Sequence, residues 1–142
     1  MTRRMLVPVD GSAPAVRAAE FAAGLAKATG CEVTLLHVYD RGGLTRLGLE
    51  ALSAEEAEEE KMRLAAPVFA AAEKPFVERG IAPERRVALG VAAEEICSLA
   101  RSGGYDHIVM GSRGASELRS LLTGSVSERV IHRAHCPVTI VR

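Results

Sequence analysis

Short apolar segments alternate with longer segments of helical periodicity along the whole chain. Five segments have the pattern of strands, at residues 4–9, 32–38, 85–90, 105–111 and 136–142. The first of these, RMLVPV, is apolar almost throughout, which is typical of a strand covered on both faces of a parallel sheet. The alternation predicts a single α/β domain over residues 1–142, with an open five-stranded parallel sheet and helices on both faces.

Capping residues mark the helices between these strands. Ser12 is a candidate N-cap for the first helix. A long helix begins at Ser53, where Glu56 completes a capping box. Pro67 and Pro75 are expected to kink or interrupt this helix, because proline has no amide hydrogen to donate and its ring crowds the preceding turn. Two further helices are predicted over 92–104 and 125–135.

The amino-acid composition of the chain argues against some classes of binding partner. The 142 residues include 18 Lys plus Arg and 18 Asp plus Glu, so the formal net charge is zero. Without a clustered basic patch, this balance argues against nucleic acid or an anionic membrane surface as a partner. No segment approaches the roughly 20 apolar residues of a membrane span. Three cysteines far apart in sequence, and no secretory signal, predict a soluble protein of the reducing cytoplasm.

The candidate ligand site lies where strands end. In open α/β sheets, ligands bind at the carboxyl ends of the strands, near the point where the strand order reverses. This rule directs attention to Asp10, to Val38 and to the glycine-rich stretch 111–128. Asp10 stabilises the turn after the first strand or, as the favoured interpretation, contacts a ligand.

The stretch GSRGASELRSLLTGSVSE contains glycines at 111, 114 and 124, the last followed by Ser125. No P-loop lysine is present, and no G-x-G-x-x-G follows the first strand. Gly111 and Gly114 are expected to adopt positive φ and to allow close approach of a ligand. The following helix would present backbone amides to phosphate, with hydroxyl donors from Ser125 and Ser127. On spacing alone, a turn followed by an ordinary serine cap explains the stretch equally well.

Four segments together resemble the universal stress protein family: LVPVDGS, LLHV, MGSRGASELRSLLTGSVSE and CPVTIVR. The resemblance covers the whole chain, and the complete G-x2-G-x9-G-S motif is that of the family's ATP-binding branch. It implies the strand order 3-2-1-4-5 of an adenine nucleotide α-hydrolase-like, Rossmann-like fold. That order brings the first and fourth strands side by side.

The resemblance also implies a set of nucleotide-binding positions. The backbone of Val38 would contact adenine beside Pro8 and Val9, and Asp10 would hold a ribose hydroxyl or help to position a metal. Met110 and Gly111 would lie near the ribose. The phosphates would be bound by Gly114, Gly124, Ser125, Val126 and Ser127.

Other candidates stay open at this stage. Arg113 is placed to reach a γ-phosphate or is equally well an exposed loop residue. His132, His135 and Cys136 lack a fourth metal ligand in the sequence and are not interpreted as a metal site. The loop from Arg41 to Leu52 matches no pattern of the family.

The resulting hypothesis is an ATP-binding regulator or sensor of the stress response, with Mg²⁺ or Mn²⁺ bound alongside the phosphates. The motif has no lysine and no evident water-positioning residue, so we expect at most slow ATP hydrolysis. A homodimer is expected through the terminal strand, Val138 to Val141, which would be an apolar sheet edge. The alternatives are a nucleotide hydrolase or nucleotidyl-transferring enzyme on a related fold, and a dimeric interaction module that binds no nucleotide.

Overall fold

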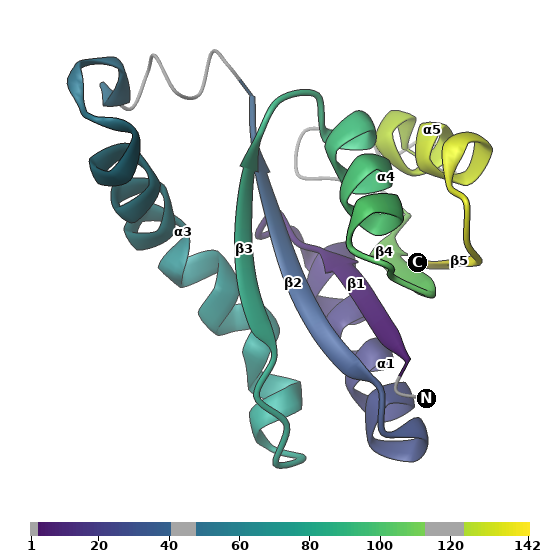
Figure 1. Ribbon diagram of the computed structural model, residues 1–142. Coiled ribbons are helices and arrows are strands. Elements are labelled where there is room, and N and C mark those ends of the chain that lie inside the picture. Colours follow the sequence, from purple (N-terminus) through teal and green to yellow (C-terminus); the bar gives the residue numbers. More distant parts are fainter. Residues whose placement is uncertain (1–2, 41–47, 113–123) are drawn as a thin grey trace.

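Five parallel strands form one sheet in a computed structural model that describes residues 3–40, 48–112 and 124–142 (Figure 1). The strand order is β3-β2-β1-β4-β5, which confirms the order implied by the family resemblance. The strands are β1 (Arg4–Pro8), β2 (Glu32–Tyr39), β3 (Glu84–Leu89), β4 (His107–Gly111) and β5 (Val138–Val141).

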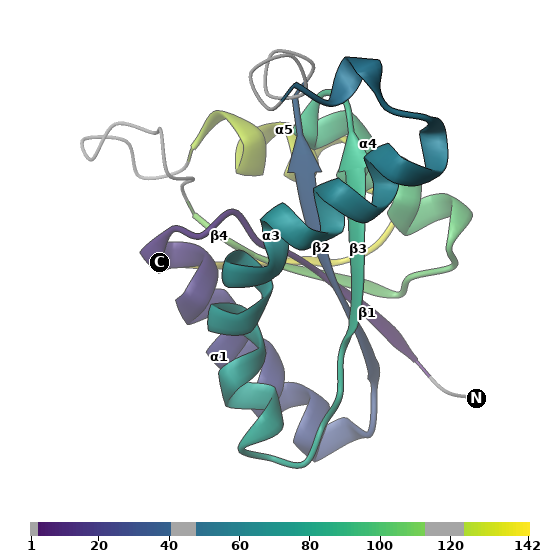
Figure 2. The same ribbon diagram turned by 90° about the vertical axis from the view of Figure 1, so that its left-hand side faces the viewer.

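Helices cover both faces of the sheet, as predicted. They are α1 (Ala13–Thr29), α3 (Ala54–Val77), α4 (Ala92–Ser102) and α5 (Ser125–Arg133), with a short 3-10 turn η1 (Leu49–Ala51) before α3. The pair α1 and α3 packs on one face, and α4 and α5 pack on the other (Figure 2). Within the part of the chain that the structure describes, no helix combines the length and apolarity needed to cross a bilayer.

The predicted caps of the first two helices are confirmed. The Ser12 hydroxyl accepts a hydrogen bond from the amide of Ala15 at 3.3 Å. Ser53 and Glu56 form both bonds of the capping box, each 3.1 Å long. Because these bonds satisfy amides that the helix itself leaves unpaired, they determine where α1 and α3 begin.

Pro67 and Pro75 were expected to kink or interrupt the long helix, and the interruption is wrong, since α3 continues from Ala54 to Val77 through both of them. Phe69 and Phe76 are fully buried against the sheet. Burying such a side chain contributes about 1.5–3 kcal/mol, so a row of buried residues offsets the roughly 3 kcal/mol that an interior proline costs. Pro75 is itself buried in this row.

The register of the sheet places two distant segments together. Met5 pairs with His107 and Leu6 with Ile108, so β1 and β4 are neighbours in the middle of the sheet. Parallel strands share the direction of their carboxyl ends. The turn after β1 and the end of β4, about a hundred positions apart in sequence, therefore meet at one edge of the sheet.

Candidate functional site

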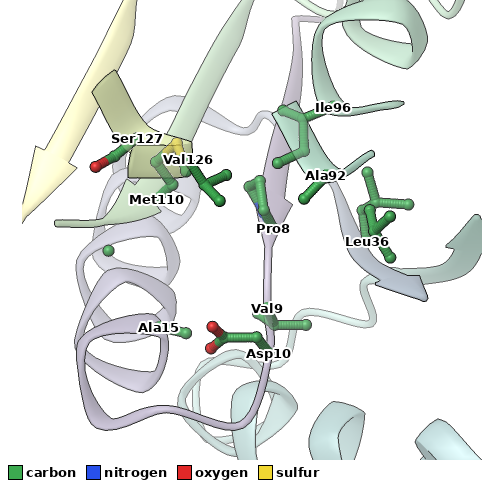
Figure 3. A pocket seen from close by; sticks show the side chains of 12 residues that line it. Pro8, Val9, Asp10, Ala15, Leu36, Ala92, Ile96, Met110, Val126 and Ser127 are labelled. Carbon is green, nitrogen blue, oxygen red and sulfur yellow. The ribbon is translucent and has the colours of Figure 1, made fainter. Parts of the chain in front are cut away.

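An apolar cavity opens at the carboxyl edge of the sheet, between the ends of β1, β2 and β4 and the first turns of α1, α4 and α5 (Figure 3). The cavity has a volume of about 100 Å³, which is less than the roughly 300–1,000 Å³ usual for small-molecule sites, and its mouth is open to solvent. Its lining consists of Pro8, Val9, Asp10, Ala15, Leu36, Val38, Ala92, Ile96, Met110, Gly111, Val126 and Ser127.

The end of β1 is held against β2 by bonds on both sides of Val9. The Val9 amide donates to the carbonyl of Leu36 at 2.8 Å, which extends the pairing past Pro8, a residue without an amide hydrogen. The Val9 carbonyl lies 2.8 Å from Nδ1 of His37. His37 is thus a hydrogen-bonded strand histidine, and it helps to position the wall of the cavity.

Asp10 occupies a tight turn between β1 and α1. One carboxylate oxygen, Oδ1, accepts a hydrogen bond from the Ser12 amide at 3.0 Å. Gly11 follows with φ of 84°, a conformation that residues with a side chain rarely adopt. The turn-stabilising role of Asp10 is therefore present in the structure. The same carboxylate lines the cavity, next to Ala15 (Figure 3).

Gly111 differs from the prediction both in its backbone conformation and in the group that lies close to it. It is not among the described glycines that have a positive φ. A Cβ added at Gly111 would lie 2.7–2.9 Å from backbone and side-chain atoms of Pro14 in the first turn of α1. The missing side chain therefore allows α1 to pack on the end of β4, whereas the prediction assigned the space to a ligand.

The tip of α5 is joined directly to the end of β4. The Gly124 amide donates to the carbonyl of Ser112 at 2.5 Å, and the Ser127 hydroxyl donates to the same carbonyl at 2.8 Å. Glu128 is the first α5 residue whose amide bonds to a carbonyl of the helix start, that of Gly124. The amides of Val126 and Ser127 precede this ladder and belong to the positive end of the helix dipole.

The hydroxyl of Ser127 does not fit its predicted role as a phosphate donor. The side chain is buried, and its hydrogen is used within the protein. The backbone of the first turn is then the source of donors at this end of the cavity.

Most predicted positions that the structure describes lie at this cavity. The predicted residues that line the cavity are Pro8, Val9, Asp10, Val38, Met110, Gly111, Val126 and Ser127. Gly124 and Ser125 lie at the tip of α5 without lining the cavity themselves. Arg113 and Gly114 lie outside the described residues, as do positions 41–47 of the loop from Arg41 to Leu52. The ligand contacts of all these residues remain predictions.

The sequence interpretation missed four lining residues, Ala15, Leu36, Ala92 and Ile96. Ala92 and Ile96 belong to α4, which follows β3. The rule that ligands bind at the carboxyl ends of strands applies to β3 as well, and it gave a signal for the start of α4. The alanines and Leu36 have ordinary core character, so no local pattern distinguishes them from other buried residues.

The described residues contain no group of three or more His, Cys, Asp or Glu side chains that could hold a metal ion. Cys136 is half-buried beside the core on the α4 and α5 face. Its burial raises the pKa of the thiol above the usual value, which favours the protonated form.

Comparison with known proteins gives consistent matches over the full length. The family model described as the Universal stress protein family matches residues 1–142. Universal stress protein YxiE of Bacillus subtilis is 34% identical over 148 residues, covering 100% of both chains. Universal stress protein MJ0577 of Methanocaldococcus jannaschii is 32% identical over 155 residues, covering 100% of this chain and 96% of that protein.

Solved structures share the fold. A structure of MJ0577 superposes with a TM-score of 0.78 and 30% identity, covering 99% of this chain and 96% of its own. A universal stress protein in complex with cAMP has a TM-score of 0.76 and 23% identity, covering 99% and 97%. One from Archaeoglobus fulgidus in complex with dAMP has a TM-score of 0.70 and 22% identity, covering 100% and 98%. At these last two identities the likeness shows the fold alone.

Proposed function

Since the chain belongs to the universal stress protein family, we propose that its apolar cavity binds an adenine nucleotide, and ATP in particular. The observation that carries the proposal is that the apolar cavity lies next to the N-terminal tip of α5. The apolar cavity is suited to the base, and the amides at the helix N-terminus are suited to an anionic phosphate. Support comes from universal stress proteins of the same fold that were solved with cAMP and dAMP.

The base and the ribose occupy the part of the cavity near β1 and β2. Pro8 and Val9 provide an apolar wall, and the backbone of Val38 supplies the polar contact to the edge of adenine. Asp10 faces the ribose from the mouth of the cavity, where its carboxylate accepts hydrogen bonds from hydroxyl groups. Met110 of β4, whose side chain lies near Val126 at the cavity (Figure 3), is the residue that we assign to the sugar.

The phosphates extend toward α5. The amides of the first turn and the dipole of the helix stabilise their negative charge. Gly124 keeps the approach to these amides free of a side chain, and Ser125 is exposed at the same tip. Arg113 and Gly114 complete this group as positions carried over from the family motif.

A divalent cation, Mg²⁺ or Mn²⁺, is bound mainly through the phosphates. The motif from Gly111 to Ser125 contains no lysine, and phosphoryl transfer needs charge neutralisation and a positioned nucleophile. We therefore expect binding with turnover well below about 1 per second, the slow end of ordinary enzymes.

Binding of ATP is proposed to regulate this protein as a sensor in the stress response. A homodimer through β5 and a location in the cytoplasm belong to the same proposal. The position of β5 at the edge of the sheet supports the dimer.

Thermal unfolding with and without Mg-ATP tests the proposal. A ligand at about 100 times its dissociation constant adds about 2.7 kcal/mol to the stability of the folded state, which raises Tm by roughly 5 °C or more for a domain of this size.

Gly124→Val is expected to abolish the shift, because its side chain would stand in front of the first-turn amides. The φ of −74° at Gly124 is ordinary, so valine does not strain the backbone.

Gly24→Val is the matched control, since a Cβ at Gly24 has no atom within 4 Å. It should leave the ATP-induced shift intact. A wild-type protein whose Tm does not respond to ATP, ADP, AMP or cAMP would contradict nucleotide binding and favour an interaction module. Rapid release of phosphate or pyrophosphate would instead favour an enzyme.

A further inference from the structure

The hydroxyl of Ser127 has an internal role at the tip of α5. The residue is only 2% exposed. Its Oγ donates to the carbonyl of Ser112 at 2.8 Å and lies 3.0 Å from the carbonyl of Gly124. Because a hydroxyl has a single hydrogen, both carbonyls share this donor.

Ser112 is the fixed end of this connection. It is 3% exposed, and its amide donates to the carbonyl of Val141 in β5 at 2.8 Å. Its carbonyl accepts two bonds from α5, one from the Gly124 amide and one from the Ser127 hydroxyl. The tip of the helix is therefore tied to a residue that belongs to the sheet hydrogen-bonding network.

We propose that Ser127 is a positioning residue whose hydroxyl anchors the tip of α5 to the end of β4 and so holds the first-turn amides at the cavity. This proposal rests on the proposed function, because those amides are the groups assigned to the phosphates. Turning the hydroxyl toward a phosphate would break a buried hydrogen bond and weaken the support of Gly124. Anchoring in the absence of ligand means that the phosphate end of the cavity is preorganised.

Ser125 offers a matched comparison two positions earlier. It is exposed at the tip of the same helix, whereas Ser127 is buried beneath it. The bond between Gly124 and Ser112 joins backbone atoms and does not involve the Ser125 hydroxyl. The two serines should therefore give different results in the protein without nucleotide.

Amide hydrogen exchange of Gly124, followed by NMR in the nucleotide-free protein, measures the anchor directly. Ser127→Ala is expected to speed this exchange about fivefold or more, as the loss of one hydrogen bond would. Ser125→Ala is expected to stay within roughly twofold of wild type. Ser127→Thr keeps the hydroxyl and should restore most of the protection.

Calorimetric titration with Mg-ATP and with adenosine gives the second readout. Ser127→Ala should weaken binding of ATP about tenfold and change binding of adenosine less than about twofold, since displaced amides matter only to the phosphates. Unchanged exchange of Gly124 in Ser127→Ala would overturn the anchor, even if ATP binding fell. Faster exchange with unchanged ATP affinity would overturn the positioning role.

The two proposals fail in different ways. A wild-type protein that binds neither ATP nor adenosine removes the proposed function. In that case the exchange of Gly124 still decides whether Ser127 anchors the helix tip, because that measurement needs no ligand.

Discussion

Gly111 ends β4 with its α-carbon against the first turn of α1. The contact with Pro14 explains the glycine by packing between two elements of the fold. A glycine within a nucleotide-binding motif therefore acts on the site indirectly, by letting α1 approach and by placing the turn that contains Asp10. Whether a ligand also contacts its backbone is a separate property.

Gly111→Ala is expected to destabilise the protein even without nucleotide. The new Cβ would lie 2.7–2.9 Å from Pro14, and the shift needed to relieve such overpacking typically costs about 1–3 kcal/mol. Urea denaturation of the nucleotide-free protein measures this cost. Gly24→Ala is the control, because a Cβ at Gly24 meets no atom within 4 Å. Equal stability of the two variants would contradict the packing role of Gly111.

His107 joins β4 to β5 through its side chain. Its Nε2 lies 2.7 Å from the hydroxyl of Thr139. Burial lowers the pKa of His107 below the usual value, because the charged ring loses solvation. The unfolded chain then takes up this proton at a higher pH than the folded protein does. The contribution of His107 to stability is therefore present above its unfolded pKa and is lost as the pH falls.

His107→Gln is expected to flatten this pH dependence. Between about pH 7.5 and pH 5.5, a range that includes the usual histidine pKa of about 6.5, wild-type stability should fall more than that of the variant. Urea denaturation at several pH values gives the comparison, with the exposed residue His132 replaced by Gln as control. Parallel curves for wild type and His107→Gln would rule out the effect.

At the scale of elements, α3 shows packing overriding a local signal. Pro67 is exposed and Pro75 is buried, although both stand inside the helix. Each proline costs a similar amount of free energy within the helix itself. The buried residues of α3 that face the sheet, among them Phe69 and Phe76, stabilise the helix in spite of this cost. The two positions should therefore respond differently to substitution.

Pro67→Ala is expected to stabilise the protein by roughly 2 kcal/mol. An interior helical proline costs about 3 kcal/mol relative to alanine, and the greater freedom of the unfolded chain takes back up to about 1 kcal/mol. Pro75→Ala should gain less, because it also leaves a cavity in the core. Chemical denaturation of both variants measures the difference, and destabilisation by Pro67→Ala would contradict this account.

At the scale of the whole molecule, the two edges of the sheet differ. β3 presents Glu84, Arg85 and Arg86, all exposed, and charges of this kind prevent pairing with another chain. β5 consists of VTIV, half-buried at every position, and pairs with β4 on one side. The apolar edge is therefore the better template for a second copy of the chain.

Sedimentation at micromolar concentration should give a particle of twice the 15.1 kDa chain mass. Amide exchange at low and high protein concentration then locates the contact. We expect concentration-dependent protection in β5 and none in β3, which serves as the internal control. A particle of monomer mass throughout would refute the dimer, and protection at β3 would refute the interface.

Much of this molecule follows from local sequence. Alternating patterns predicted the five strands, Ser12 and Ser53 predicted the starts of two helices, and the glycine motif pointed to the edge of the sheet at which the cavity opens. The strand order came from family resemblance, because hydrophobic periodicity carries no information about which strands are neighbours. Helix and strand ends shifted by a few residues, as at Tyr105, which is buried before β4 begins.

The amino-acid sequence by itself determined the class of fold and several of the segments that form the cavity, whereas the contribution of α4 came from the structure. Only the tertiary structure decided that Gly111 accommodates Pro14, that the Ser127 hydroxyl bonds to Ser112, and that α3 passes through its prolines. Periodicity, capping and turn preferences act between residues close in sequence. Each of the later findings depends on contacts between separate elements, whose distances exist only once the chain has folded.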